Sequence, residues 1–195
     1  MRFPRIYPEN MTDAQRALAD SYRASSWRAA IAQPDGRLGG PFDATLRSPD
    51  LAGRLAGVSN YFRTGTELPP RLNEFAILLI AQQWNSQFEW HAHCASALAA
   101  GLEAAKAQAI GQGKRPAGML EDEECVHDFV TELLARHKVG DAMFARATAV
   151  LGEGKLVDLV AVCGYYTLVA MMLATADVKA PPLPAGVPPL EENAS

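Results

Sequence analysis

Cysteine is scarce in this chain. Three of its 195 residues are cysteines, Cys94, Cys125 and Cys163, and no two of them form a CxxC pair. An odd number of widely spaced cysteines supports neither a disulfide framework nor a thiolate metal site. We therefore expect buried, unreactive thiols and a reducing compartment, the cytoplasm.

A dense basic run is also lacking. The chain has 18 lysines and arginines against 22 acidic residues, scattered along its length, and a formal net charge of −4. Binding to a phosphate backbone needs a basic patch, so nucleic acid is not an expected partner. The first residues lack the apolar segment of a secretory signal and are interrupted by Pro4 and Pro8, which also favours the cytoplasm.

Long apolar runs are missing, with one exception. Residues 159–176 carry no charge over 18 positions, which is the lower edge of what can span a bilayer. Asp158 and Asp177 flank this run, without the basic and aromatic anchors of a membrane interface. A helix that is apolar all round also suits the centre of a helical bundle or a subunit interface. We adopt that interpretation and expect no membrane partner.

Sustained strand-type alternation is absent and helical patterns dominate, which predicts an all-α fold. The expected helices lie at residues 12–30, 48–62, 86–100, 121–137, 141–151 and 156–176, with a further helix after Pro70. That further helix contains an unbroken apolar run, residues 75–81, and should be surrounded by protein. Residues 33–42 are rich in glycine and proline, so we expect a loop there that could fold over a neighbouring pocket.

No internal repeat and no linker long enough to separate two domains is evident. We therefore expect a single domain over residues 1–195. Residues 1–36 would form an N-terminal extension of that domain. The Pro-rich tail, residues 181–195, would lie extended on the surface or on a partner subunit.

The reactive side chains gather around the end of the predicted core helix. Glu89 and His93 are four residues apart, so a helix places them on one face within hydrogen-bond reach. Glu74, on the core helix, could meet them. Two carboxyls in a dry site would share a proton near neutral pH, which suits acid and base work. The spacing equally allows a surface pair of Glu89 with His93 and a solvated Glu74, and it does not choose between the two.

A metal site receives less support from the same segment. His91 and His93 diverge on a helix, with His91 pointing nearly opposite to Glu89 and His93, and the H-E-x-x-H pattern of helical zinc sites is absent. We expect no metal ligands here.

A longer pattern connects these residues with a known family. It consists of Glu74, then Ser86-Gln-Phe-Glu89-Trp90-His-Ala-His93, then Ala99-Ala-Gly101-Leu102. Together with Gly40-Pro41-Phe42, Leu68-Pro69-Pro70-Arg71 and Gly164-Tyr165-Tyr166, it resembles the carboxymuconolactone decarboxylase family of the alkylhydroperoxidase-D-like (AhpD-like) superfamily over about residues 37–180. The resemblance implies an AhpD-like helical bundle and a homo-oligomer, trimer or hexamer, with the long apolar helix as a candidate interface.

The redox branch of that superfamily uses a glutamate, a CxxC pair and a histidine as a thiol peroxidase. Glu74 and His93 match its glutamate and histidine, but Ser86 and Glu89 stand at the cysteine positions. Cys94 has no partner three residues away, so no disulfide can form in this motif. The chain therefore resembles a longer branch without the CxxC pair, in which peroxidase activity of this type is not expected.

The decarboxylase branch acts on a carboxylated unsaturated lactone in bacterial aromatic degradation. Loss of CO₂ leaves a dienolate, which requires a placed hydrogen-bond donor and an acid of matched pKa and no metal or organic cofactor. By resemblance, we expect Glu89, oriented by His93, to deliver the proton and Glu74 to tune or relay it. Trp90 and Phe42 would wall the pocket.

The remaining expectations concern the ligand and the class of function. Gln82 and Ser86 are the other expected contacts to a small-molecule substrate. The leading interpretation is a cofactor-free lyase, with three alternatives left open. These are an isomerase or hydrolase with the same acid and base groups, an alkylhydroperoxidase-like redox protein, and a non-catalytic oligomeric binding protein. The sequence does not identify the substrate.

Overall fold

The computed structural model describes residues 1–25 and 33–192, and these residues contain helices and no β-strand. The elements in chain order are η1 (Pro8–Asn10), α1 (Asp13–Arg23), α2 (Pro41–Thr45), α3 (Pro49–Thr64), α4 (Pro70–Gln83), α5 (Gln87–Ala99), α6 (Ala104–Gly111), α7 (Glu121–Arg136), α8 (Asp141–Leu151) and α9 (Glu153–Ala176). The predicted all-α fold is confirmed. Residues 26–30 of the first predicted helix lie outside the described residues.

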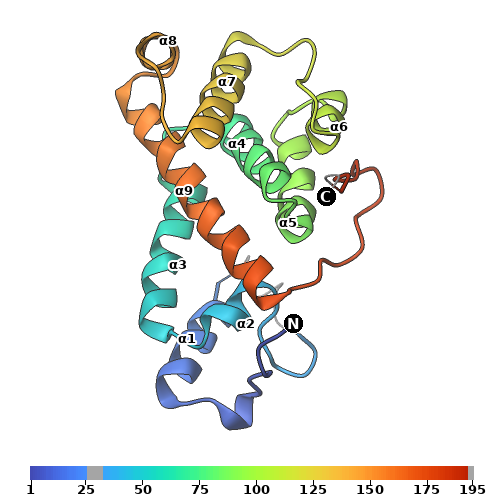
Figure 1. Cartoon of the computed structure of the whole chain (residues 1–195). Coiled ribbons are helices and arrows are strands. Elements are labelled where there is room, and N and C mark those ends of the chain that lie inside the picture. The colour runs from blue at the N-terminus through green and yellow to red at the C-terminus, as the bar shows by residue number, and fades with distance from the viewer. Residues whose placement is uncertain (26–32, 193–195) are drawn as a thin grey trace.

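Helix α4 is the centre of the core. Every residue from Phe75 to Ala81 is buried, and all of them except Leu79 have no exposed surface. Helices α5, α6, α7 and α9 all pack against α4, which Figure 1 shows in the middle of the bundle. The predicted core helix is therefore confirmed, and it starts as expected at a proline, whose missing N–H is not needed at a helix N-terminus.

Helix α9 runs along the length of the bundle and contacts helices at both ends of it. It contacts α8 near its start and α2 near its end, with α3 beside it (Figure 1). By length and composition α9 could cross a membrane, and 44% of its most apolar window is buried inside the structure. One face of α9 thus belongs to the core, whereas Val157, Val160 and Met171 are exposed.

The N-terminal segment packs on α3 as a second, smaller hydrophobic cluster. The hydroxyl of Tyr22 in α1 donates a hydrogen bond to the carbonyl of Ala52 in α3 at 3.1 Å. The Tyr22 ring meets the edge of Phe42 with ring centroids 5.1 Å apart. These contacts fix the segment around α2 against α3, where it forms one wall of the pocket described below.

Helix ends agree with the sequence where capping residues are clear. Thr12 and Gln15 form a capping box at the start of α1, where the sequence predicted a helix to begin. The sequence did not predict α6, a short alanine-rich helix without a clear apolar stripe. Lys106 of α6 is buried, and its ammonium lies 2.8 Å from the carboxylate of Glu123, which also binds Arg71. A long-range ion pair of this kind cannot be read from local periodicity.

The Pro-rich tail runs back along the helical bundle. The indole N–H of Trp90 donates to the carbonyl of Pro188 at 2.8 Å, and the amide of Glu191 donates to the carbonyl of Gly111 at 2.9 Å. Leu190 is buried in the main core cluster. The tail therefore lies extended on the protein, as predicted, and is held at its far end.

The burial of α4 generates a stability prediction. Leu78→Ala should lower the free energy of unfolding by about 2–5 kcal/mol because it leaves a cavity in the core. Val58→Ala, on the exposed side of α3 at 41% exposure, is the matched control and should change it by no more than about 0.5 kcal/mol. Urea unfolding of both variants measures the difference. Equal effects would contradict the assignment of α4 as the core helix.

Candidate active site

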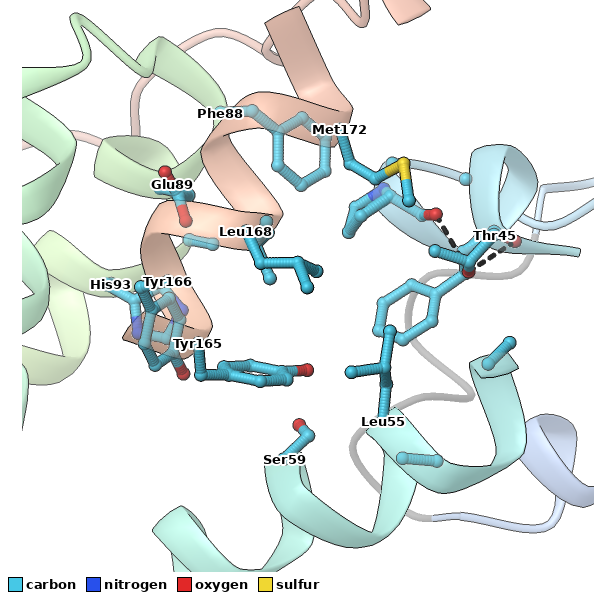
Figure 2. Close-up of a pocket in the computed structure, with 18 of the residues that line it drawn as sticks. Thr45, Leu55, Ser59, Phe88, Glu89, His93, Tyr165, Tyr166, Leu168 and Met172 are labelled. Atoms are coloured by element: carbon cyan, nitrogen blue, oxygen red, sulfur yellow. Dashed lines mark hydrogen bonds between the residues drawn. The ribbon is translucent and has the colours of Figure 1, made fainter. Parts of the chain in front are cut away.

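A pocket of about 420 Å³ lies between α2, α3, α5 and α9. Figure 2 shows Glu89, His93 and Tyr166 at one side of it and Thr45 and Leu55 at the other. Gln33, Gly39 and Gly40 of the predicted loop line the pocket, so this loop borders a pocket as the sequence predicted. The loop is shorter than predicted, because Pro41 and Phe42 line the pocket from the first turn of α2. Most of the lining side chains are apolar: Pro41, Phe42, Ala52, Leu55, Ala56, Phe88, Ala92, Leu168, Val169, Met172 and Pro181.

Glu89 is a buried acid on the wall of this pocket. Glu89 is 2% exposed, and neither of its carboxyl oxygens has a hydrogen-bond partner among the described residues. Burial raises the pKa of Glu89 to about 8, and the nearby Ser86 hydroxyl offsets part of that rise. The Ser86 hydroxyl itself does not meet Glu89 in hydrogen-bond geometry. Glu89 is therefore a protonated carboxylic acid at neutral pH.

A second buried glutamate shows what makes Glu89 unusual. Glu123 is 1% exposed, and burial alone would raise its pKa. Hydrogen bonds from Lys106, the Leu120 amide and Arg71 more than offset this effect, so the pKa of Glu123 is lowered. Two glutamates with similarly low solvent exposure are thus an ionised, structural carboxylate where cations surround the group and a neutral acid where none does.

His93 pairs with Glu74 rather than with Glu89. The Nδ1 atom of His93 lies 2.8 Å from Oε2 of Glu74, and the ring meets the edge of Tyr166 with centroids 4.9 Å apart. Because a carboxylate only accepts hydrogen bonds, Nδ1 is the donor in this pair. The expected orientation of Glu89 by His93 is not observed. The α5 register places both side chains on one face, but Glu74 reaches across from α4 and binds the ring.

The predicted substrate contacts separate into two groups. Phe42 lines the pocket with Glu89 and His93, whereas Gln82 and Ser86 line two other cavities, of about 180 Å³ and 530 Å³. Trp90 has no exposed surface and points into the core, where it holds the tail. Its place on the helix explains this, because the residue after Glu89 faces about 100° away from it.

Several lining residues were missed by sequence reasoning. Tyr165 and Tyr166 were given no role from the sequence, yet both line the pocket. His91 was expected to point away, but it reaches the rim, and its Nδ1 is buried without a partner in the described part of the chain. Ser59 and Arg63 come from α3, which carried no chemical motif. The Gly164-Tyr165-Tyr166 segment was the one available signal.

The thiols lie outside this site. All three cysteines are free and buried, and none of them lines the pocket. Burial raises the pKa of Cys94 to about 11 and that of Cys163 to about 12, and it also raises that of Cys125. Within residues 1–25 and 33–192, no group of three His, Cys, Asp or Glu side chains converges to hold a metal ion.

The raised pKa of Glu89 predicts a pH-dependent stability. The unfolded protein releases this proton near pH 4.5 and the folded protein near pH 8, so the contribution of Glu89 falls as pH rises between these values. Wild type should therefore lose a few kcal/mol more than Glu89→Gln between pH 5 and pH 8. Urea unfolding at both pH values measures this. Parallel pH profiles of the two proteins would contradict a neutral Glu89.

The loop over the pocket generates a second prediction. Gly40 has φ +61°, and a Cβ there would lie inside van der Waals contact of the Phe88 ring. Gly118, with φ +65° and nothing near its Cβ position, is a matched control for backbone strain. Gly118→Ala should cost about 1–2 kcal/mol, and Gly40→Ala should cost more because Phe88 must also move. Thermal unfolding of both variants measures these losses of stability. Equal losses in Gly40→Ala and Gly118→Ala would show that Phe88 does not pack on Gly40.

No family model and no curated relative matches the sequence significantly. Several solved structures are similar, among them the following two. One is an uncharacterised peroxidase-related protein from Ralstonia eutropha JMP134, described as an alkylhydroperoxidase AhpD core, with a TM-score of 0.73, 15% identity and 92% of each chain covered. The other is a protein of unknown function from Agrobacterium tumefaciens, described as a putative antioxidant defence protein AhpD, with a TM-score of 0.63, 15% identity, and coverage of 70% of this chain and 94% of that one. The chain therefore has the AhpD-like helical fold.

Proposed function

We propose that the protein is a cofactor-free lyase that decarboxylates a small carboxylated lactone or a related intermediate of aromatic degradation. The observation that carries the proposal is Glu89, a buried acid with no hydrogen-bond partner in the described residues, on the wall of a mostly apolar pocket. An acid with a pKa of about 8 is protonated at neutral pH and can give its proton to carbon at that pH.

The proposed reaction balances with these residues alone. The bond between the substrate carboxylate and the ring carbon breaks, CO₂ leaves, and the bonding electron pair moves into the lactone carbonyl as a dienolate. Glu89 then protonates carbon and becomes a carboxylate, and solvent returns the proton. The apolar lining favours the first step, because a carboxylate loses its hydration there while CO₂ is neutral.

His93 is assigned to the oxyanion. Its Nδ1 atom is held by Glu74, so Nε2 is the ring nitrogen that can face a ligand in the pocket. A ring with protons on both nitrogens donates a hydrogen bond from Nε2 to the dienolate oxygen. Glu74 is then a positioning residue, since it acts through His93, and Tyr166 packs against the ring from its edge.

The thiol peroxidase alternative has less support. Both structural neighbours carry peroxidase or antioxidant descriptions. A thiol peroxidase needs a reactive thiolate in its pocket, and none of the cysteines lines this one. An isomerase or hydrolase would use the same acid, and it differs from a decarboxylase in releasing no CO₂.

Glu89→Gln and His93→Ala test the proposal. With a carboxylated muconolactone as substrate, ultraviolet absorbance and CO₂ release should show wild-type turnover, and each variant should reduce kcat by about 10²-fold or more. Glu121→Gln, an exposed change on α7, is the control and should keep full activity. Unchanged turnover in both site variants would refute the roles of Glu89 and His93.

The pH profile of the same reaction is a separate prediction. Glu89 must hold its proton to act, so wild-type kcat/KM should be retained at neutral pH and fall as pH rises through about 8. Initial rates between pH 6 and pH 10 measure this. A rate that increases through pH 8 would mean that the carboxylate is the active form.

A further inference from the structure

The pocket is large for a single ring. An apolar cavity of about 150 Å³ holds benzene, so a pocket of about 420 Å³ has room for a two-ring body with a short polar arm. Tyr22, Phe42 and Thr45 are among the residues that line the pocket from the N-terminal part of the chain. Figure 2 shows Thr45 across from Leu168 and Met172 of α9. Both long walls therefore suit a flat apolar body.

One permanently charged side chain lines the pocket in the described part of the chain. Among the described residues that line it, Arg63 is the one with a permanent positive charge, and Glu89, the one acid, is protonated at neutral pH. Arg63 belongs to the last turn of α3 and is exposed, which places it at the mouth of the pocket. Burial raises the pKa of Tyr166, and the Arg63 charge opposes this rise, so the field of the guanidinium reaches the pocket interior.

We infer that Arg63 binds a carboxylate that the substrate keeps, and that this carboxylate is attached to an apolar body of about two rings. A guanidinium matches a carboxylate with two parallel N–H donors, and the partly apolar surroundings strengthen the pair. The scissile carboxylate would then lie at Glu89, deeper in the pocket. The placement of the scissile carboxylate at Glu89 rests on the proposed function. The substrate class is defined by its size, about two rings, and by the carboxylate that it keeps.

Binding of a product-like probe tests the inference without turnover. Calorimetry at pH 7 would compare 2-naphthoate with its neutral analogue 2-naphthamide and with the smaller benzoate. We expect wild type to bind 2-naphthoate more tightly than either. Arg63→Gln should weaken 2-naphthoate binding by about tenfold and remove its advantage over the amide, because the charged hydrogen bonds are lost.

Two further variants control for folding and for long-range charge. Arg54→Gln lies on α3 outside the pocket and should bind 2-naphthoate as wild type does. Arg63→Lys keeps the charge and should recover part of the binding that Arg63→Gln loses. Equal binding to Arg63→Gln and Arg54→Gln, or benzoate binding as tight as that of 2-naphthoate, would overturn the inference.

Failure of the Arg63 inference can be distinguished from failure of the proposed lyase function. Glu89→Gln should still bind 2-naphthoate, because the probe has no scissile carboxylate to place at Glu89. If Arg63 governs binding while Glu89→Gln keeps full turnover, the ligand class stands and the lyase proposal falls. If Glu89→Gln abolishes turnover while Arg63→Gln binds the probe normally, the lyase proposal stands and the role of Arg63 is refuted.

Discussion

Burial of an unpartnered carboxyl at Glu89 is the constraint around which the site is organised. Removing an ionised carboxylate from water without a hydrogen-bond partner is far costlier than holding the group protonated. The surrounding fold therefore decides the protonation state of Glu89, by burying it on α5 against α4 and next to an apolar pocket. Glu123 has similarly low solvent exposure but is bonded to Lys106 and Arg71, and its pKa is lowered, so low exposure by itself does not produce this state.

The rest of the bundle supports this arrangement. Helix α4 is surrounded by protein and carries Glu74, which holds the ring of His93 on α5. The neighbouring Trp90 enters the core and binds the returning tail. The side chains on the pocket side of α5 are thus fixed from behind by packing, while α2, α3 and α9 complete the opposite walls. Rigid support of this kind keeps a reacting group in place.

Local signals predicted the longer helices, but not the short helices α2 and α6. The apolar run at residues 75–81 predicted the core helix, and the i, i+4 spacing placed Glu89 and His93 on one face. The partner of His93 was not predictable from spacing, because two carboxyls on different helices could reach it and tertiary packing chose Glu74. The resemblance also implied that Trp90 walls the pocket, whereas helix geometry turns its side chain towards the core. Arg63 and Ser59 came from a helix without any motif, and only the fold brings them to the pocket.

The protonation state of Glu89 can be observed directly. Carboxyl ¹³C chemical shifts of wild type and Glu89→Gln, followed from pH 5 to pH 10, would isolate the resonance of this one residue. The account predicts that Glu89 is protonated at pH 7 and titrates near pH 8. A Glu89 resonance that titrates near the ordinary value of about 4.3 would contradict it, since the pocket would then hold a carboxylate instead of an acid.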